Sequence, residues 1–221
     1  MTNIDAGEWV LDRFTSEDWR KYDDELEKGK ITLQECLQRQ FRLVRASASR
    51  IVNEVEPLVT FRDGLGDLVD YCNSKEIPFV VVSGGLDFII RRLLSEKKLI
   101  NEVGIFAPKA RATKQGIVMR FPRLFEGSSN FKRDLVGWYR AKGWQTYFIG
   151  DGLSDFEAIE NADVRFVIKG SVLAGLCKRA GVEVREISDF VAVRSALARH
   201  GDRHHPEASG LRTAPILGNG G

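Results

Sequence analysis

The chain has 221 residues, of which 43% are hydrophobic and 29% charged, and its formal net charge at pH 7 is +2. This length accommodates one sizeable α/β core with a small appended lobe, and the composition is ordinary for a soluble globular domain. The near balance of acidic and basic residues argues against a groove that binds a polyanion, so we expect no nucleic-acid partner.

The cysteines and the first residues indicate where the protein acts. Cys36, Cys72 and Cys177 are far apart, and none belongs to a C-x-x-C pair or has a histidine at metal-ligand spacing. This usage is typical of a reduced, cytoplasmic compartment. Residues 1–9 contain two acids and no basic residue, and no apolar run is long enough to span a membrane. We therefore expect neither export by a signal peptide nor a membrane partner.

Residues 1–58 are predicted to form a small helical lobe, because apolar residues recur there at helical spacing. Thr32 is followed three residues later by Glu35, which makes a capping box and predicts a helix over 32–46. We interpret the apolar stripes of the lobe as packing rather than as a ligand surface.

Residues 59–199 are predicted to form a doubly wound α/β core. Short, continuous apolar runs alternate with helical segments, which is typical of strands buried on both faces of a parallel sheet. A hairpin is expected over 110–121, with its turn at Gln115 and Gly116. The predicted parallel strands are 77–82, 102–106, 145–149, 164–168 and 183–187.

Residues 200–221 mix glycine, proline, histidine and polar residues without periodicity, and we predict a disordered tail. His204 and His205 lie in it, and we interpret them as tail residues rather than as metal ligands.

In a doubly wound sheet, functional residues follow the carboxyl ends of the strands. Ser83 and Gly84 follow the first predicted strand, in the segment VVVSGGLDF. A hydroxyl and unhindered backbone N–H groups at a helix start suit the binding of a phosphate. The same three residues, Ser-Gly-Gly, are also compatible with ordinary turn chemistry.

Lys132 lies at the start of a predicted helix in SSNFKRDLV, from where its ammonium could neutralise phosphate charge. Taken alone, a lysine at a helix start is usually just a solvated side chain.

Asp151 and Asp155 flank a tight turn in FIGDGLSDFEAI, directly after a predicted strand. Two close carboxylates repel each other unless a cation lies near them, and hard oxygen ligands of this kind favour Mg²⁺. The alternative is that Asp155 simply favours a helix N-terminus. The alternating ligands of an EF-hand calcium loop are absent.

The order of Ser83, Lys132 and G-D-G-x-x-D resembles the haloacid dehalogenase (HAD) superfamily of phosphatases, over residues 1 to about 199. Within it, VSGGLDF and GDGLSDFEAI are most similar to the phosphoserine phosphatase-like branch, and in particular to the methionine-salvage phosphatases that act on 2-hydroxy-3-keto-5-methylthiopentenyl-1-phosphate.

The resemblance implies a magnesium-dependent phosphomonoester hydrolase that acts on a small phosphorylated metabolite through an aspartyl-phosphate. It implies that Ser83, Gly84 and Lys132 bind the phosphoryl group, and that Asp151 binds Mg²⁺ with support from Asp155. Ser83, Lys132 and Asp155 would be its catalytic residues here, and the lobe at 1–58 would be the cap.

The chain departs from the family at its front end. Family members open with a hydrophobic strand ending in D-x-D-x-T or D-x-D-x-V, whose first aspartate attacks phosphorus and whose second is the general acid and base. No aspartate here is followed by another two positions later. In the family this strand is central, between those predicted at 77–82 and 145–149, and its loss would expose two apolar edges. We therefore expect a gene start placed too late, with the nucleophile upstream of Met1. The competing hypothesis is a catalytically inactive phosphate-binding or regulatory protein.

Overall fold

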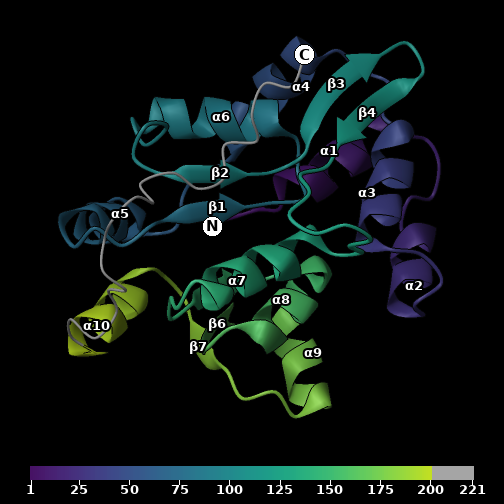
Figure 1. Ribbon diagram of the computed structural model, residues 1–221. Helices are drawn as coiled ribbons and strands as arrows, with labels where there is room; N and C mark the ends of the chain where they lie inside the picture. Colours follow the sequence, from purple (N-terminus) through teal and green to yellow (C-terminus); the bar gives the residue numbers. More distant parts are fainter. Residues whose placement is uncertain (201–221) are drawn as a thin grey trace. The chain divides into compact units, whose positions relative to one another are not determined.

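The computed structural model of the protein describes residues 1–200 (Figure 1). These residues separate into two compact units, each assembled from interleaved parts of the chain. The hairpin unit comprises Thr2–Thr60 and Val80–Arg123, and the three-strand unit comprises Met1, Phe61–Phe79 and residues 124–200. The domain boundaries at 58 and 199 stay predictions. The expected disorder of the tail, with His204 and His205, lies outside the described residues.

The hairpin unit begins with helices whose starts are fixed by side-chain caps. Asp5, Thr32 and Ser47 each accept a hydrogen bond from a backbone N–H of the following helix, and Thr32 and Glu35 form the predicted capping box. Leu33, Cys36 and Phe41 are among the buried residues of the third helix. The helices of this unit are α1 (Ala6–Phe14), α2 (Lys21–Glu27), α3 (Leu33–Arg42), α4 (Ala48–Val55), the 3₁₀ turn η1 (Glu56–Leu58) and α6 (Asp87–Glu96).

Two short parallel strands and an antiparallel hairpin complete the unit. Val80 in β1 (Val80–Val82) pairs with Gly104 in β2 (Gly104–Phe106). The hairpin consists of β3 (Lys109–Thr113) and β4 (Gly116–Arg120) and confirms the predicted hairpin. Its turn lies at Lys114 and Gln115, one residue earlier than predicted, because Gly116 already pairs with Thr113 as the first residue of β4. It lies along α3 (Figure 1).

The side-chain amide of Gln38 joins α3 to the hairpin. Its oxygen accepts a hydrogen bond from the backbone N–H of Met119 (3.2 Å), and its nitrogen donates one to the carbonyl of Ile117 (3.5 Å). The amide thus satisfies two backbone groups on the edge of β4, much as a further strand would.

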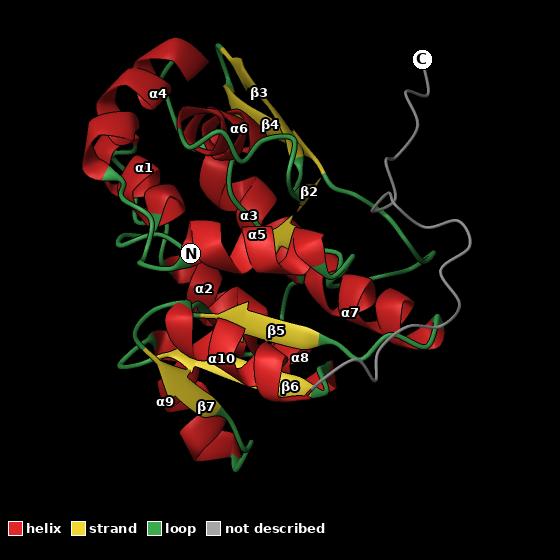
Figure 2. Ribbon diagram, turned by 90° about the vertical axis from the view of Figure 1, so that its left-hand side faces the viewer, coloured by secondary structure: helices red, strands yellow, loops and turns green. Residues whose placement is uncertain are grey.

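The three-strand unit contains a parallel sheet in the order β5-β6-β7 (Figure 2). Ile149 pairs with Phe166, and Phe166 pairs with Arg185 on the other side. Within residues 1–200, β5 pairs with β6 alone, so β5 forms one edge of this sheet. The strands are β5 (Tyr147–Gly150), β6 (Val164–Ile168) and β7 (Arg185–Ile187).

Helices α8 and α9 pack on the strands of this sheet, and α5 packs against α10. Phe166 and Leu173, at most 2% exposed, are part of the core that these contacts bury. The helices are α5 (Leu65–Ser74), α7 (Phe131–Ala141), the 3₁₀ turn η2 (Leu153–Asp155), α8 (Phe156–Asn161), α9 (Val172–Ala180) and α10 (Val191–His200).

The predicted α/β class with parallel strands is confirmed. The strand predicted at 164–168 has those bounds, whereas the one predicted at 77–82 is confined to Val80–Val82. Pro78 has no N–H to donate to a ladder, and the N–H of Ile77 closes the preceding helix by bonding the carbonyl of Cys72 (2.8 Å).

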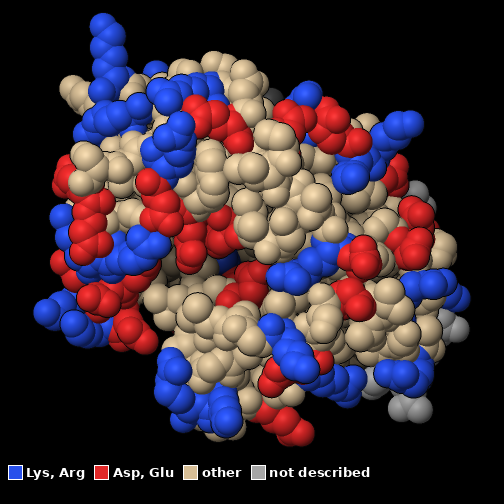
Figure 3. All heavy atoms as spheres, turned by 180° about the vertical axis from the view of Figure 1, so that it is seen from behind, with Lys and Arg blue, Asp and Glu red and all other residues tan. Residues whose placement is uncertain are grey.

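Acidic and basic side chains are interspersed over the face shown in Figure 3. Within residues 1–200, none of the helices combines the length and apolar character needed to cross a membrane. The expectation that nucleic acid is not a partner stays a prediction.

Candidate active site

Lys132 is held at the start of α7 by an asparagine cap. The side chain of Asn130 accepts hydrogen bonds from the backbone N–H groups of Lys132 (3.0 Å) and Arg133 (3.2 Å). Phe131, 1% exposed, anchors the same turn in the core. As a result Lys132, which a helix start would usually leave in solvent, is 5% exposed.

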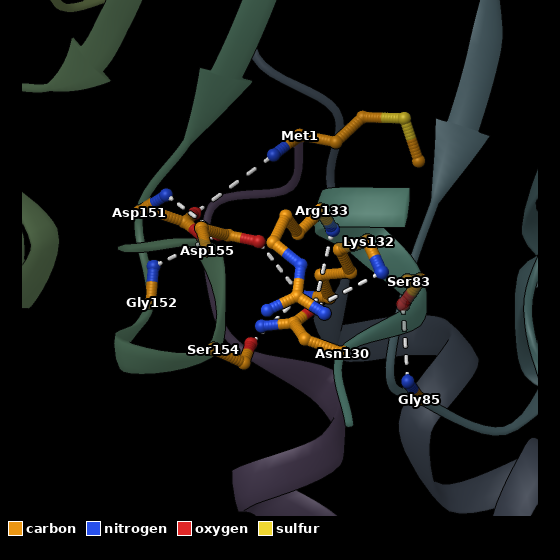
Figure 4. A network of polar contacts seen from close by, with 10 residues as sticks. All are labelled: Met1, Ser83, Gly85, Asn130, Lys132, Arg133, Asp151, Gly152, Ser154 and Asp155. Atoms are coloured by element: carbon orange, nitrogen blue, oxygen red, sulfur yellow. Dashed lines mark hydrogen bonds and ion pairs between the residues drawn. The ribbon is translucent and has the colours of Figure 1, made fainter. Parts of the chain in front are cut away.

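The Lys132 ammonium lies in a buried polar cluster with Asp155 and Ser154 (Figure 4). Its Nζ is 2.7 Å from Asp155 Oδ1 and 2.7 Å from Ser154 Oγ. An ammonium has three N–H donors, so these two contacts leave one N–H for a further acceptor. The cluster therefore combines a fixed positive charge with an available donor, which suits a phosphoryl oxygen.

Asp155 also shapes the loop after β5. Its second oxygen, Oδ2, accepts hydrogen bonds from the backbone N–H groups of Asp151 (3.1 Å) and Gly152 (3.2 Å). A Cβ on Gly150 would lie 2.9 Å from Asp155 Oδ2 and 2.9 Å from Leu173, so the turn closes only around a glycine. Both oxygens of Asp155 thus have partners within the protein.

Asp151 is the more exposed carboxylate of this loop. Its side chain is 43% exposed, and its Oδ2 lies 3.9 Å from the amino group of Met1. Within the described residues, no group of three or more histidine, cysteine, aspartate and glutamate side chains is arranged to hold a metal. Mg²⁺ commonly takes one or two carboxylates and completes its shell with water and phosphate oxygens. The exposed carboxylate of Asp151 is compatible with that pattern, and its role as a Mg²⁺ ligand stays a prediction.

Ser83 and Gly84 lie in the hairpin unit, at the exit of β1. The backbone N–H of Ser83 donates to the carbonyl of Phe106 (3.1 Å), and the Ser83 hydroxyl oxygen accepts a hydrogen bond from the N–H of Gly85 (3.1 Å). This bond orients the hydroxyl and leaves its hydrogen able to donate. The structure thus brings Lys132, Asp151 and Asp155 together in one unit. The expectation that Ser83 converges with them stays a prediction.

Three residues of the site were not predicted from the sequence. Asn130 has a recognisable signal, since asparagine directly before a helix is a favoured cap. The only signal for Ser154 in the sequence is that it directly precedes Asp155. Arg133, which forms an ion pair with Glu157 at 2.7 Å and so ties α7 to α8, gave no signal because surface arginines are common.

Comparisons with known proteins identify the family of the chain. Haloacid dehalogenase-like hydrolases match residues 8–160, which is more than half of the chain. The chain therefore belongs to the haloacid dehalogenase-like hydrolase family.

The individual relatives share only about a quarter of their residues with this chain. The chain is similar to the 2-hydroxy-3-keto-5-methylthiopentenyl-1-phosphate phosphatase of Bacillus pumilus, with 23% identity over 84% of this chain and 81% of the relative. The phosphatase of the same name from Bacillus velezensis shares 25% identity over 87% of this chain and 83% of the relative.

The fold is similar to that of a phosphoserine phosphatase solved as a phospho-aspartyl intermediate analogue. The TM-score is 0.63, with 16% sequence identity, over 88% of this chain and 92% of that one. The resemblance of the sequence to this branch of the family is thus confirmed, and the structural likeness defines the HAD-like fold.

Proposed function

We propose that the protein is a magnesium-dependent phosphomonoester hydrolase of the aspartyl-phosphate type, which acts on a small phosphorylated metabolite. The observation that carries this proposal is the buried Lys132 ammonium, held by Asp155 and Ser154 next to the Gly150–Gly152 turn. Because Asp155 and Ser154 hold the ammonium in place, its remaining N–H is oriented to make a charge-assisted hydrogen bond to a phosphoryl oxygen.

Each residue has a separate task in this proposal. Lys132 donates to a phosphoryl oxygen and offsets the negative charge there. Asp155 keeps Lys132 oriented and holds the backbone of the Asp151 turn. Ser83 and the Gly84 backbone would donate to other oxygens of the same phosphoryl group.

Asp151 is the residue proposed to hold Mg²⁺, with Asp155 in support from the same loop. When bound, the ion supplies positive charge that polarises the phosphoryl oxygens. The three buried thiols are free, in keeping with the reduced cytoplasm that we propose as the location.

A second candidate function follows from the missing D-x-D sequence. The aspartyl-phosphate route needs an aspartate as nucleophile, and no aspartate of the 221 residues lies in such a motif. A protein that binds phosphate through Ser83, Lys132 and Asp151 without turnover is the competing proposal. The two proposals share the binding site and differ in chemistry.

Binding and turnover of the full chain test the two proposals in turn. Titration calorimetry with inorganic phosphate and Mg²⁺ should show binding, and Lys132→Met should weaken it by about 10-fold or more, because a charged hydrogen bond contributes about 1.5–3 kcal/mol. Lys178→Met, which removes an exposed lysine of the same unit, is the matched control. Unchanged binding in Lys132→Met would contradict both proposals.

Turnover is then measured with 2-hydroxy-3-keto-5-methylthiopentenyl-1-phosphate, the substrate named for the two Bacillus relatives, and with phosphoserine. For the 221-residue chain alone we expect binding without significant turnover, since its sequence offers no D-x-D nucleophile. Joining an apolar strand that ends in D-x-D-x-T ahead of Met1 should produce turnover under the hydrolase proposal, and should leave binding without turnover under the inactive alternative. Magnesium-dependent turnover by this chain would show that another residue attacks phosphorus and would exclude the inactive alternative. Asp151→Asn should weaken Mg²⁺ binding, with Asp163→Asn as the control.

A further inference from the structure

Leu37 of α3 packs directly on the turn that follows β1. A Cβ built on Gly84 would lie 2.8 Å from Leu37 Cδ1 and 3.4 Å from Leu37 Cδ2, so the leucine methyl groups cover the Gly84 backbone. Both residues belong to the hairpin unit. Leu37 is half-buried, in contrast to the fully buried Leu33 one turn earlier, so part of its apolar surface is left open beside the turn.

The helix face around Leu37 carries no charge. Side chains three or four residues apart share a face of a helix, which places the uncharged residues Leu33, Gln34, Gln40 and Phe41 near Leu37. The amide of Gln40 is engaged by the Asp23 carboxylate of α2 at 2.8 Å. The charged residues of α3 lie on the opposite side, and each has a contact there. Glu35 completes the capping box, Arg39 pairs with Glu25 at 3.0 Å, and Arg42 bonds Gln115 at 3.3 Å.

We propose that Leu37 is a specificity-determining residue, which selects phosphomonoesters whose organic group is uncharged next to the ester oxygen. This inference rests on the proposed binding of phosphate at the Ser83–Gly84 turn. A substituent on that phosphate would run past Leu37, where an alkyl group gains apolar contact. An ammonium or carboxylate would be desolvated there with no partner of opposite charge on this face of α3, which is unfavourable.

Calorimetric titrations of the full chain with three ligands test the proposal, each in the presence of Mg²⁺. The ligands are inorganic phosphate, n-butyl phosphate and O-phosphoserine. We expect the wild-type chain to bind n-butyl phosphate more tightly than O-phosphoserine. Leu37→Ala should weaken n-butyl phosphate by about 5-fold to 10-fold, from the loss of apolar contact, and inorganic phosphate by less than about 2-fold.

Two further variants separate recognition from folding. Leu37→Met keeps an apolar side chain of similar volume and should keep the affinity for n-butyl phosphate within about 2-fold. Leu26→Ala removes another half-buried leucine, on α2 of the same unit, and should leave all three affinities unchanged. Circular dichroism spectra identify any variant that has lost its helices.

The outcomes distinguish this inference from the function on which it rests. Equal losses for n-butyl phosphate and inorganic phosphate in Leu37→Ala would show that Leu37 only supports the turn, which overturns the inference and leaves the proposed function intact. Unchanged affinity for n-butyl phosphate would overturn it in the same way. If the wild-type chain binds no inorganic phosphate, the proposed function fails and the inference fails with it.

Discussion

The Lys132 ammonium and the Asp155 carboxylate form an ion pair of 2.7 Å in which the side chains are only 7% and 10% exposed. Such a pair offsets the cost of burying its own charges only while both partners are present. Asp155 adds two backbone hydrogen bonds to the loop after β5, so the same residue supports both the cation and the turn.

Removing Lys132 should therefore destabilise the fold strongly. We expect Lys132→Met to lower the free energy of unfolding by about 3–5 kcal/mol, because Asp155 is left buried without its countercharge. Denaturant unfolding followed by circular dichroism measures the change. The control is Glu54→Gln at the Arg13 and Arg50 ion pairs on the surface, where a much smaller loss is expected. Equal losses in the two variants would contradict the buried character of the Lys132 pair.

Gly116 should tolerate no side chain, because the hairpin docks on α3 at this point. Its φ is +108°, and a Cβ there would overlap the carbonyl oxygen of Arg42. Gly116→Ala should cost more than about 2 kcal/mol of unfolding free energy, from backbone strain together with displacement of the hairpin.

Gly29 provides the matched control for this substitution. Its φ of +65° is also left-handed, but no atom lies within 4 Å of its would-be Cβ. Gly29→Ala should cost only about 1 kcal/mol, the strain of the left-handed conformation alone. If the two variants lose the same unfolding free energy, the contact between the hairpin and α3 at Gly116 contributes nothing to stability.

Asp23 and Glu8 lie in the helical part of the hairpin unit. Both carboxyls should increase the stability of the folded state as the pH is lowered. Burial raises the pKa of Asp23, against the hydrogen bonds donated by Gln40 and Cys36. Partial burial, and then the negative charges of Asp5 and Asp23, raise the pKa of Glu8. A carboxyl whose pKa is higher in the folded state binds its proton more tightly there, so its contribution to stability increases as the pH falls through the folded pKa.

Asp23→Asn should remove one of these carboxyls and shift the other. We expect the free energy of unfolding of the variant at pH 7 to equal or exceed that of the wild-type chain. The increase of this free energy as the pH is lowered should be smaller in the variant than in the wild-type chain. The pKa of Glu8, followed by NMR titration, should fall because a neighbouring negative charge is gone. Asp24→Asn, on the exposed side of α2, should leave the pKa of Glu8 unchanged. A rise in that pKa in Asp23→Asn would contradict the coupling of the two carboxyls.

The thiols should be unreactive in the native protein. Cys36, Cys72 and Cys177 are all buried. Burial raises the pKa of each, and that of Cys72 to about 11. Because the thiolate is the reactive form, labelling with a disulfide reagent at pH 8 should be at least about a hundredfold slower than in denaturant. Ser74→Cys, at an exposed position, supplies a fast-reacting reference. Fast labelling of the unmodified native chain would show that a thiol is accessible.

Much of the fold was predictable because the signals were local. The capping box at Thr32 fixed the start of α3, and the apolar run at 164–168 marked β6. The end of α3 was less predictable. The helix stops at Arg42, since Leu43 and Val44 donate to carbonyls only three residues back and Ser47 already caps α4. The interleaving of the two units had no local signal, because it depends on contacts between segments far apart in sequence.

In the candidate site the residue types were predictable and their contacts were not. Lys132 and Asp155 were identified separately, but nothing in the sequence indicated that they form a buried pair 23 positions apart. That pairing depends on the Asn130 cap, which directs Lys132 inward, and on a turn that requires Gly150. The cover that Leu37 provides over Gly84 is likewise a tertiary contact.

The interleaving of the two units sets an order of events during synthesis. All described residues of the hairpin unit precede residue 124, so its helices, β1 with β2, and the hairpin can assemble while the rest of the chain is still being translated. Helix α5 is made early, yet its partner α10 is among the last described segments to leave the ribosome. The packing of α10 on α5 can therefore form only late in translation, which makes α5 a natural point of contact for a chaperone until then.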